Sequence, residues 1–167
     1  MIIIIEGIDR VGKTTLCNKL SKKLNIPIHK YKGIVPYDKM NNDEETDKTL
    51  GLIQLIKETN ADIIFDRSYI SDYVYGILQR GYDIANAFKN FKLVNDALYN
   101  YSLQGKVYII LVKSTDIKKS SLEHGKDLQE HEYLFCDAYN LIDENLVNKI
   151  CCDYNTIDAV LNIIKGE

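Results

Sequence analysis

A loop with two glycines, a lysine and a threonine at fixed spacing is the clearest chemical signal in the sequence. Residues 7 to 14 read Gly-x-x-x-x-Gly-Lys-Thr. A short apolar run, Met1 to Ile5, precedes the loop and leucines at helical spacing follow it, so strand, loop and helix are predicted in the order that a phosphate-binding loop requires. Glycines at both ends let the backbone curl around an anion, and consecutive N–H groups at the helix start can surround a diphosphate.

This pattern predicts ATP and Mg²⁺ as cofactors. Lys13 is expected to reach the β- and γ-phosphates, and the hydroxyl of Thr14 is expected to ligate Mg²⁺. A glycine turn that carries Lys-Thr by chance is the other interpretation, but it leaves the agreement of strand, loop and helix unexplained.

Arginine is rare in this chain, so the position of each one is informative. Arg10 lies inside the loop, and Arg67 directly follows a predicted strand at 61–66. A guanidinium group presents a planar fork that matches phosphate bidentately. Because ligands of parallel sheets bind outside the carboxyl ends of the strands, both arginines are predicted to contact phosphate. Arg80 is instead expected to form a surface salt bridge.

Short apolar strands alternate with amphipathic helices along the chain. This alternation predicts one α/β domain over 1–167, a three-layer sandwich with a five-stranded, mainly parallel sheet and helices on both faces. The polar stretch 114–127 is interpreted as a short flap. The predicted strands lie at 1–5, 26–31, 61–66, 107–112 and 149–152, and the later helices at 71–101 (two, broken at Arg80-Gly81), 128–147 and 156–165.

Composition narrows the possible partners. The net charge is −3 and no basic block is present, which disfavours a nucleic-acid polymer as partner. The apolar run at the start is too short for a membrane span or a signal peptide, so we expect no membrane partner and a cytoplasmic location. The four cysteines lack Cys-x-x-Cys spacing and are expected to be reduced. Tyrosines between 69 and 101 are expected mostly in the core, although a homodimer through this region is possible.

Three segments resemble thymidylate kinases. Residues 6–15, Glu-Gly-Ile-Asp-Arg-Val-Gly-Lys-Thr-Thr, resemble the phosphate loop of this family, in particular of the subtype with an arginine inside the loop. Residues 65–71 are similar to its Asp-Arg-Tyr-x-x-Ser segment, with Ser68 in place of the tyrosine, and residues 152–158 resemble the segment that borders the adenine. The resemblance implies a P-loop fold and transfer of phosphate from ATP to a deoxynucleoside monophosphate, with a dTMP-like pyrimidine as the favoured acceptor.

The resemblance also implies residue roles. It implies that Asp9 contacts the acceptor sugar and the water shell of the metal, and that Arg10 bridges the donor and acceptor phosphates. The implied catalytic residues are Asp9, Arg10, Lys13 and Arg67, and the implied metal-binding residues are Thr14 and Asp66. The implied cofactor-binding residues are Gly7, Asp9, Arg10, Val11, Gly12, Lys13, Thr14, Thr15 and Asp153. The implied substrate-binding residues are Asp9, Lys32, Asp66, Arg67, Ser71, Asp72 and Tyr75.

The sequence departs from the family between residues 32 and 66. This stretch lacks the Phe-x-x-x-Arg segment that grips thymine in thymidylate kinases. Lys30 and Lys32 are candidates to replace the arginine that follows the second strand of the family, and a solvated lysine is the equally weighted interpretation. The residues 114–126 contain no arginine, as in the loop-arginine subtype.

A deoxynucleoside kinase is the second candidate. Residues 66–72, Asp-Arg-Ser-Tyr-Ile-Ser-Asp, resemble the Glu-Arg-Ser-x-x-Ser-Asp segment of that family, in which the second acid reads the base. In that role Asp72 would favour an amino-bearing base, because a carboxylate only accepts hydrogen bonds. The other interpretation is that Asp72 caps a helix or lies on its exposed face. A nucleoside hydroxyl would also need a carboxylate base near the second strand, and residues 26–37 contain neither Asp nor Glu.

A nucleotide-dependent switch is the third candidate. It is disfavoured because Arg-Ser-Tyr follows Asp66 and because no Asn-Lys-x-Asp guanine motif is present.

Overall fold

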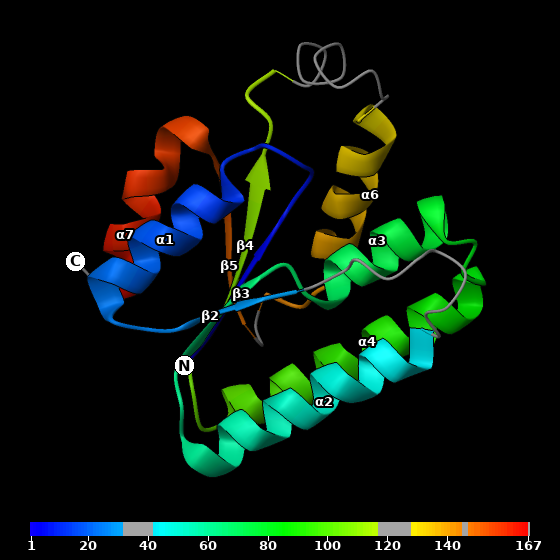
Figure 1. The fold of residues 1–167 in the computed structure, drawn as a ribbon, viewed down its shortest axis with the longest axis horizontal. Helices are drawn as coiled ribbons and strands as arrows, with labels where there is room; N and C mark the ends of the chain where they lie inside the picture. Colours follow the sequence, from blue (N-terminus) through cyan, green and yellow to red (C-terminus); the bar gives the residue numbers. More distant parts are fainter. Residues whose placement is uncertain (32–41, 117–127, 145–146, 167) are drawn as a thin grey trace.

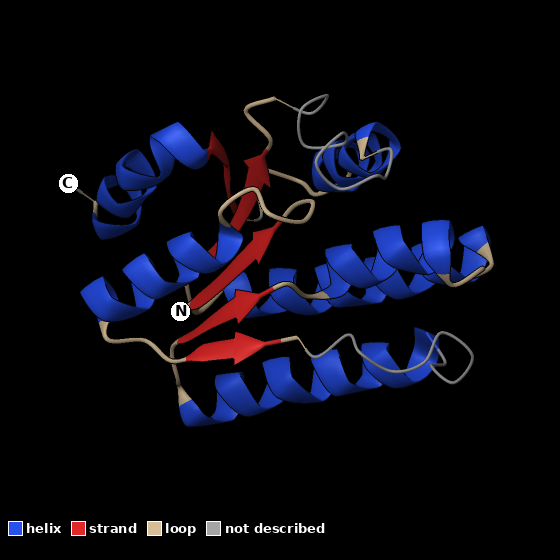
Figure 2. Cartoon of the chain, turned by 45° about the horizontal axis from the view of Figure 1, so that its top comes forward, coloured by secondary structure: helices blue, strands red, loops and turns tan. Residues whose placement is uncertain are grey.

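The computed structural model describes residues 1–31, 42–116, 128–144 and 147–166. Within them, five parallel strands form one sheet in the order β2-β3-β1-β4-β5, as Figures 1 and 2 show. The strands are β1 (Ile2–Glu6), β2 (Ile28–Lys30), β3 (Ile63–Asp66), β4 (Val107–Lys113) and β5 (Asn148–Asp153).

Strand β1 lies in the middle of the sheet and is buried on both faces. Its four isoleucines are at most 2% exposed, which explains the unbroken β-branched run, since alternation would place polar groups in the core. In the register of the sheet, Ile5 pairs with Asp66 on β3, and Glu6 pairs with Leu111 on β4. The carboxyl ends of β1 and β3 therefore lie side by side.

Helices cover both faces of the sheet (Figure 1). α1 (Lys13–Leu24) and α7 (Ile157–Lys165), which follows the short 3₁₀ turn η1 (Tyr154–Thr156), cover one face. The other face is covered by α2 (Asn42–Thr59), α3 (Tyr69–Gln79), α4 (Ile84–Ser102) and α6 (Gln129–Asn140). Right-handed crossovers place α1 on the face opposite to α2, α3, α4 and α6, because the chain leaves β1 toward β2 and then reverses direction across the sheet. The predicted three-layer α/β sandwich is confirmed.

Several predicted boundaries shift. The strand expected over 26–31 is shorter because its first residues include Pro27, which lacks an N–H and contributes only its carbonyl to Ile64. The helix expected over 128–147 ends at Asn140, and a turn leads from there toward β5. The break between α3 and α4 falls where it was expected, with Gly81 at φ 67°. Of the predicted flap, 114–116 belong to the described part, and 117–127 lie outside it.

The four cysteines are unbridged, as expected; Cys17 and Cys152 are buried, and Cys151 is exposed. None of the helices in the described ranges is both long and apolar enough to cross a membrane.

Candidate active site

A cleft of about 470 Å³ opens at the carboxyl ends of β1, β2 and β3. This is the edge at which ligands of parallel sheets bind. The cleft is lined by Asp9, Arg10, Gly12, Lys13, Thr14, Thr15, Lys30, Tyr31, Asp66, Arg67 and Tyr154. The glycine-rich loop and the turn after β3 therefore border one shared cavity.

The loop after β1 can follow its path only with glycine at its start. Gly7 has φ 135°, and a Cβ atom at this position would lie 2.2 Å from the carbonyl oxygen of Val112 on β4. At the other end, Gly12 has φ 98° and accepts the first hydrogen bond of α1 from the amide of Leu16. The two glycines thus hold the loop against β4 and deliver it to the N-terminus of α1.

Both arginines predicted to contact phosphate adopt left-handed backbone conformations. Arg10 has φ 60° and Arg67 has φ 71°, values that are uncommon for residues with a Cβ atom. Such conformations are typical of functional sites, where the surrounding structure holds them in place. The two arginines come from turns at the ends of β1 and β3 and line the same cleft.

Arg67 connects the turn after β3 to the glycine-rich loop. Its Nη1 donates to the carbonyl oxygen of Gly7 at 3.0 Å and to Ser71 Oγ at 2.9 Å, and its Nη2 donates to Asp9 Oδ1. The guanidinium carbon lies 5.2 Å from the ring centroid of Tyr75. Ser71 and Tyr75 therefore support Arg67 from α3 and are not among the residues that line the cleft.

The side chain of Lys13 is buried, although it borders the cleft. It is 5% exposed, and its Nζ donates to the carbonyl oxygen of Ile8. Burial lowers the pKa of Lys13 to about 7, the positive charge of Arg67 acts in the same direction, and the carboxylates of Asp9, Glu6 and Asp66 oppose the shift. An anion bound in the loop would restore the positive charge.

Thr14 and Asp66 meet in the cleft, as expected for the two residues assigned to the metal. Thr14 Oγ1 donates to Asp66 Oδ2 at 3.1 Å. A hydroxyl and a carboxylate fit Mg²⁺, which prefers oxygen ligands and keeps several waters or phosphate oxygens. In the part of the chain described, no three His, Cys, Asp or Glu side chains gather into a protein-only metal cage.

Asp72 and Arg80 form a buried ion pair, which corrects two expectations. The side chain of Asp72 is 8% exposed and that of Arg80 is 10% exposed, so neither an exposed helix position nor a surface salt bridge describes them. Asp72 Oδ1 accepts from Arg80 Nη1 and, at 3.2 Å, from the hydroxyl of Tyr31. Burial raises the pKa of Asp72, whereas Arg80 and Tyr31 lower it. Through Tyr31, this pair adjoins the cleft.

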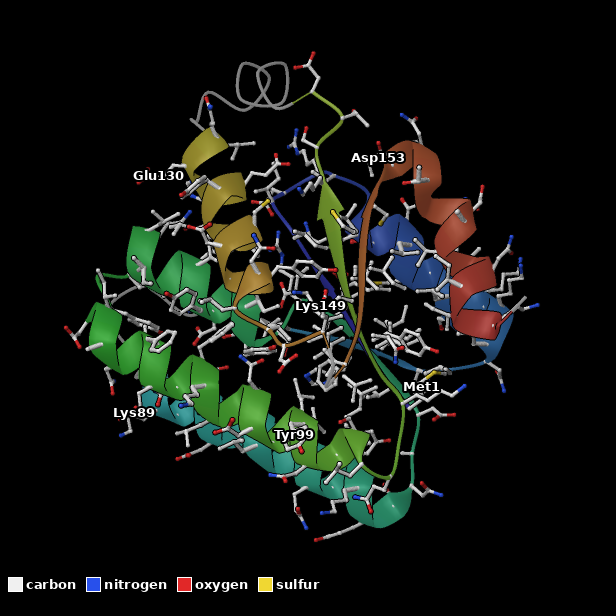
Figure 3. The ribbon with its side chains drawn as sticks, turned by 180° about the vertical axis from the view of Figure 1, so that it is seen from behind. Met1, Lys89, Tyr99, Glu130, Lys149 and Asp153 are labelled. Carbon is white, nitrogen blue, oxygen red and sulfur yellow. The ribbon has the colours of Figure 1, made fainter. Side chains whose placement is uncertain are left out.

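Asp153 does not line the cleft. It lies at the end of β5 where the chain turns into α7 (Figure 3), and its Oδ1 accepts from the amides of Asn155 and Thr156. The next residue, Tyr154, borders the cleft instead. Lys30 lines it too, and Lys32 lies outside the described residues.

Sequence reasoning missed Glu6 and Tyr31, and within the segment 152–158 it selected Asp153 where Tyr154 is the residue at the cleft. Glu6 is fully buried beside the loop and accepts hydrogen bonds from the turn after β3. A carboxylate at the end of four isoleucines was the available signal, because a buried strand tolerates an acid only where donors surround it. Nothing in the sequence distinguishes Tyr31 from the other tyrosines, whereas Tyr154 lies in the segment that resembles the border of the adenine.

Comparisons with known proteins agree with this geometry. No family model matches the chain. A protein of Acidianus bottle-shaped virus (isolate Italy/Pozzuoli), which carries the provisional name thymidylate kinase, is 33% identical over 125 residues, which are 71% of this chain and 74% of the viral protein.

Solved structures share the fold along nearly the whole chain. The YorR protein of Bacillus subtilis, in complex with phosphorylated GDP, has a TM-score of 0.74 at 21% identity, covering 99% of this chain and 94% of its own. Deoxyadenosine kinase from M. mycoides with bound dCTP has a TM-score of 0.55 at 17% identity, covering 100% of both chains. Thymidylate kinase from Ehrlichia chaffeensis has a TM-score of 0.52 at 17% identity, covering 99% and 97%.

The viral relative and the glycine-rich loop at the carboxyl end of β1 both indicate the same family. The chain belongs to the thymidylate kinase family of P-loop nucleotide kinases.

Proposed function

We propose that this protein transfers the γ-phosphate of ATP to a deoxynucleoside monophosphate, with a dTMP-like pyrimidine as the favoured acceptor. One observation carries the proposal: Arg10 in the loop after β1, Lys13 at the start of α1 and Arg67 in the turn after β3 line a single cleft. Two phosphorylated molecules that meet end to end in this cleft would have a cation at the donor, at the acceptor and between them.

A protein catalyses phosphoryl transfer mainly by positioning the reactants and by placing positive charge around the transferred group. The transferred group passes through a loose transition state, and its negative charge spreads over the equatorial oxygens. Lys13 and the loop amides would hold the donor phosphates, Arg67 would hold the acceptor phosphate, and Arg10 would stabilise charge between them. Mg²⁺ held by Thr14 and Asp66 would neutralise charge on the β- and γ-phosphate oxygens.

The carboxylates of the cleft favour a monophosphate acceptor over a nucleoside. Among the described residues that line it, the carboxylates are those of Asp9 and Asp66. Asp9 is paired with Arg67, and Asp66 accepts from Thr14, so neither is placed as a general base. A monophosphate needs no such base because its attacking oxygen is already ionised.

The Asp72–Arg80 pair supports a deoxynucleoside kinase as the second candidate. Beside Tyr31, Asp72 offers hydrogen-bond acceptors and Arg80 offers donors, a combination that matches the edge of an amino-bearing base. If this pair reads the base, the preferred substrate would carry cytosine or adenine instead of thymine.

An assay of ADP release with ATP and Mg²⁺ tests the proposal. The acceptors are dTMP, dUMP, dCMP, dGMP and dAMP, each beside its nucleoside, and Lys13→Ala is the inactive control. We expect release with one or more monophosphates and none with the nucleosides. A response to nucleosides alone would replace the proposal by the second candidate, and ADP release that no acceptor stimulates would reject both.

A further inference from the structure

Glu6 is an acidic side chain that is fully buried in the core, and this burial raises the pKa of its carboxyl group. It ends β1, is fully buried, and stands next to the first glycine of the loop. A carboxylate taken out of water is costly unless donors surround it. Here the donors are the amide of Ser68 at 2.7 Å, the amide of Ser71 at 3.3 Å and the hydroxyl of Ser71.

These donors lie at the start of α3, which has no cap of its own. The residue before the helix, Ser68, makes no side-chain capping bond. The first amides of a helix lack partners within the helix, and its N-terminus favours negative charge. Glu6 therefore caps α3 from a neighbouring strand.

The hydroxyl of Ser71 links Glu6 to Arg67. A serine hydroxyl has one proton, and Ser71 donates it to Glu6, which leaves its lone pairs to accept from Arg67 Nη1 at 2.9 Å. The backbone of Arg67 is held from the same strand, because its amide donates to the carbonyl oxygen of Ile5 at 3.1 Å. The end of β1 thus contacts both the main chain and, through one serine, the guanidinium group of Arg67.

We infer that Glu6 is a positioning residue for Arg67. Its carboxylate fixes the turn after β3 and the direction of the Ser71 hydroxyl, so that the guanidinium group is held toward the cleft. The inference rests on the proposed function for what Arg67 receives there, which is the acceptor phosphate.

The variants Glu6→Gln, Arg67→Ala and their combination test this role. Glutamine keeps the size of the side chain but turns one accepting oxygen into a donor. We expect Glu6→Gln to lower kcat/KM for the monophosphate by about 10- to 100-fold through misplacement of Arg67, with KM for ATP changed by less than about twofold. In the Arg67→Ala background the same change should cost less than about threefold, because the group it acts through is gone. An equal loss in both backgrounds would overturn the inference and leave Glu6 a helix cap only.

A matched pair of serine variants keeps the test decisive if Glu6→Gln fails to fold. Ser71→Ala removes the link to Arg67, whereas Ser68→Ala keeps the backbone bond to Glu6. We expect Ser71→Ala to lower kcat/KM for the monophosphate by about tenfold, and Ser68→Ala to stay within about twofold of wild type. Equal rates in the two variants would overturn the positioning role. Wild-type protein without phosphoryl transfer to any monophosphate would overturn the proposed function as well, whereas active wild type with fully active Glu6→Gln and Ser71→Ala rejects only the role of Glu6.

Discussion

At the scale of single residues, the cleft contains cations that the protein holds at some cost. Arg10 and Arg67 adopt left-handed backbone conformations, each of which costs about 1–3 kcal/mol. Lys13 is buried to the point that its pKa falls to about 7. An anion in the cleft would offset the cost of holding these three groups together, which agrees with a site built for phosphates.

Arg10 tests whether the loop arginine acts on the reaction or only on binding. Because its proposed target is charge that develops during transfer, Arg10→Ala should lower kcat by about 10²- to 10³-fold and change KM for either nucleotide by less than about threefold. Steady-state kinetics with both substrates varied provides the measurement, and Arg10→Lys serves as a control that keeps the charge without the fork. A loss confined to KM would show that Arg10 is a binding contact.

Lys13 predicts a pH dependence of nucleotide binding. Below pH 7 the lysine is already protonated, so binding takes up no proton there; above pH 7, binding must protonate it. The Kd of ADP with Mg²⁺ should therefore rise by up to about tenfold per pH unit between pH 7.5 and 9.5, a range in which the phosphates of ADP stay fully ionised. Calorimetry of the wild type beside Lys13→Met measures it, and a pH slope that survives in the variant would contradict the assignment to Lys13.

The lowered pKa of Lys13 also affects the ligand-free protein. The unfolded chain binds the proton of this lysine up to about pH 10.5, whereas the folded protein releases it near pH 7. Because the unfolded state then holds more protons, this group makes the free energy of unfolding increase as the pH rises from about 7 to about 10.5.

At the scale of elements, two glycines make opposite predictions for the same substitution. Gly7→Ala places a Cβ atom 2.2 Å from a carbonyl oxygen of β4 at φ 135°, so it should cost more than about 3 kcal/mol of stability or abolish nucleotide binding. Gly51, in α2, is exposed, and nothing lies within 4 Å of the place that a Cβ atom would take there, so Gly51→Ala should raise stability by about 0.5–1 kcal/mol. Urea unfolding of both variants gives the comparison, and a tolerated Gly7→Ala with normal ADP affinity would contradict the described loop.

The buried pair of α3 predicts strong coupling between two residues. Removing one partner leaves the other charge buried and unpaired, so Asp72→Asn and Arg80→Gln should each lower the free energy of unfolding by about 3 kcal/mol. The double variant should lose clearly less than the sum of the two, because no unpaired charge remains. If denaturant unfolding shows that the double variant loses as much stability as the two single variants together, the two side chains do not form the buried pair that the structure shows.

Features that depend on residues close together in the sequence could be predicted, whereas features that join distant residues could not. The strand and helix order, the loop of residues 7–14 and the break at Gly81 each depend on a few neighbouring residues, and these were predicted correctly. The Asp72–Arg80 pair was not, because it forms only where the chain folds back after α3 and Tyr82 packs against Gly76. The capping of α3 by Glu6 joins residues more than 60 positions apart and depends on the register of β1 and β3.

At the scale of the whole molecule, the strand order makes the cleft. β3 lies directly beside β1, so a turn some 60 residues along the chain returns to the glycine-rich loop. On the other side of β1, β4 supports the loop through the carbonyl of Val112. Strand pairing sets the register of these three strands, and helices lie on both faces of the sheet (Figure 2). The arrangement explains why cations from two distant segments line one cleft.

The proposed reaction requires that donor and acceptor nucleotides meet end to end in this one cleft. Calorimetric titration with adenosine and deoxythymidine joined through five phosphates, in the presence of Mg²⁺, tests it most directly. We predict one molecule bound per chain, a Kd at least about 100-fold below that of ADP or dTMP alone, and loss of most of this gain in Arg67→Ala. Binding no tighter than that of ADP, or binding of dTMP beside the bound analogue, would contradict the shared cleft.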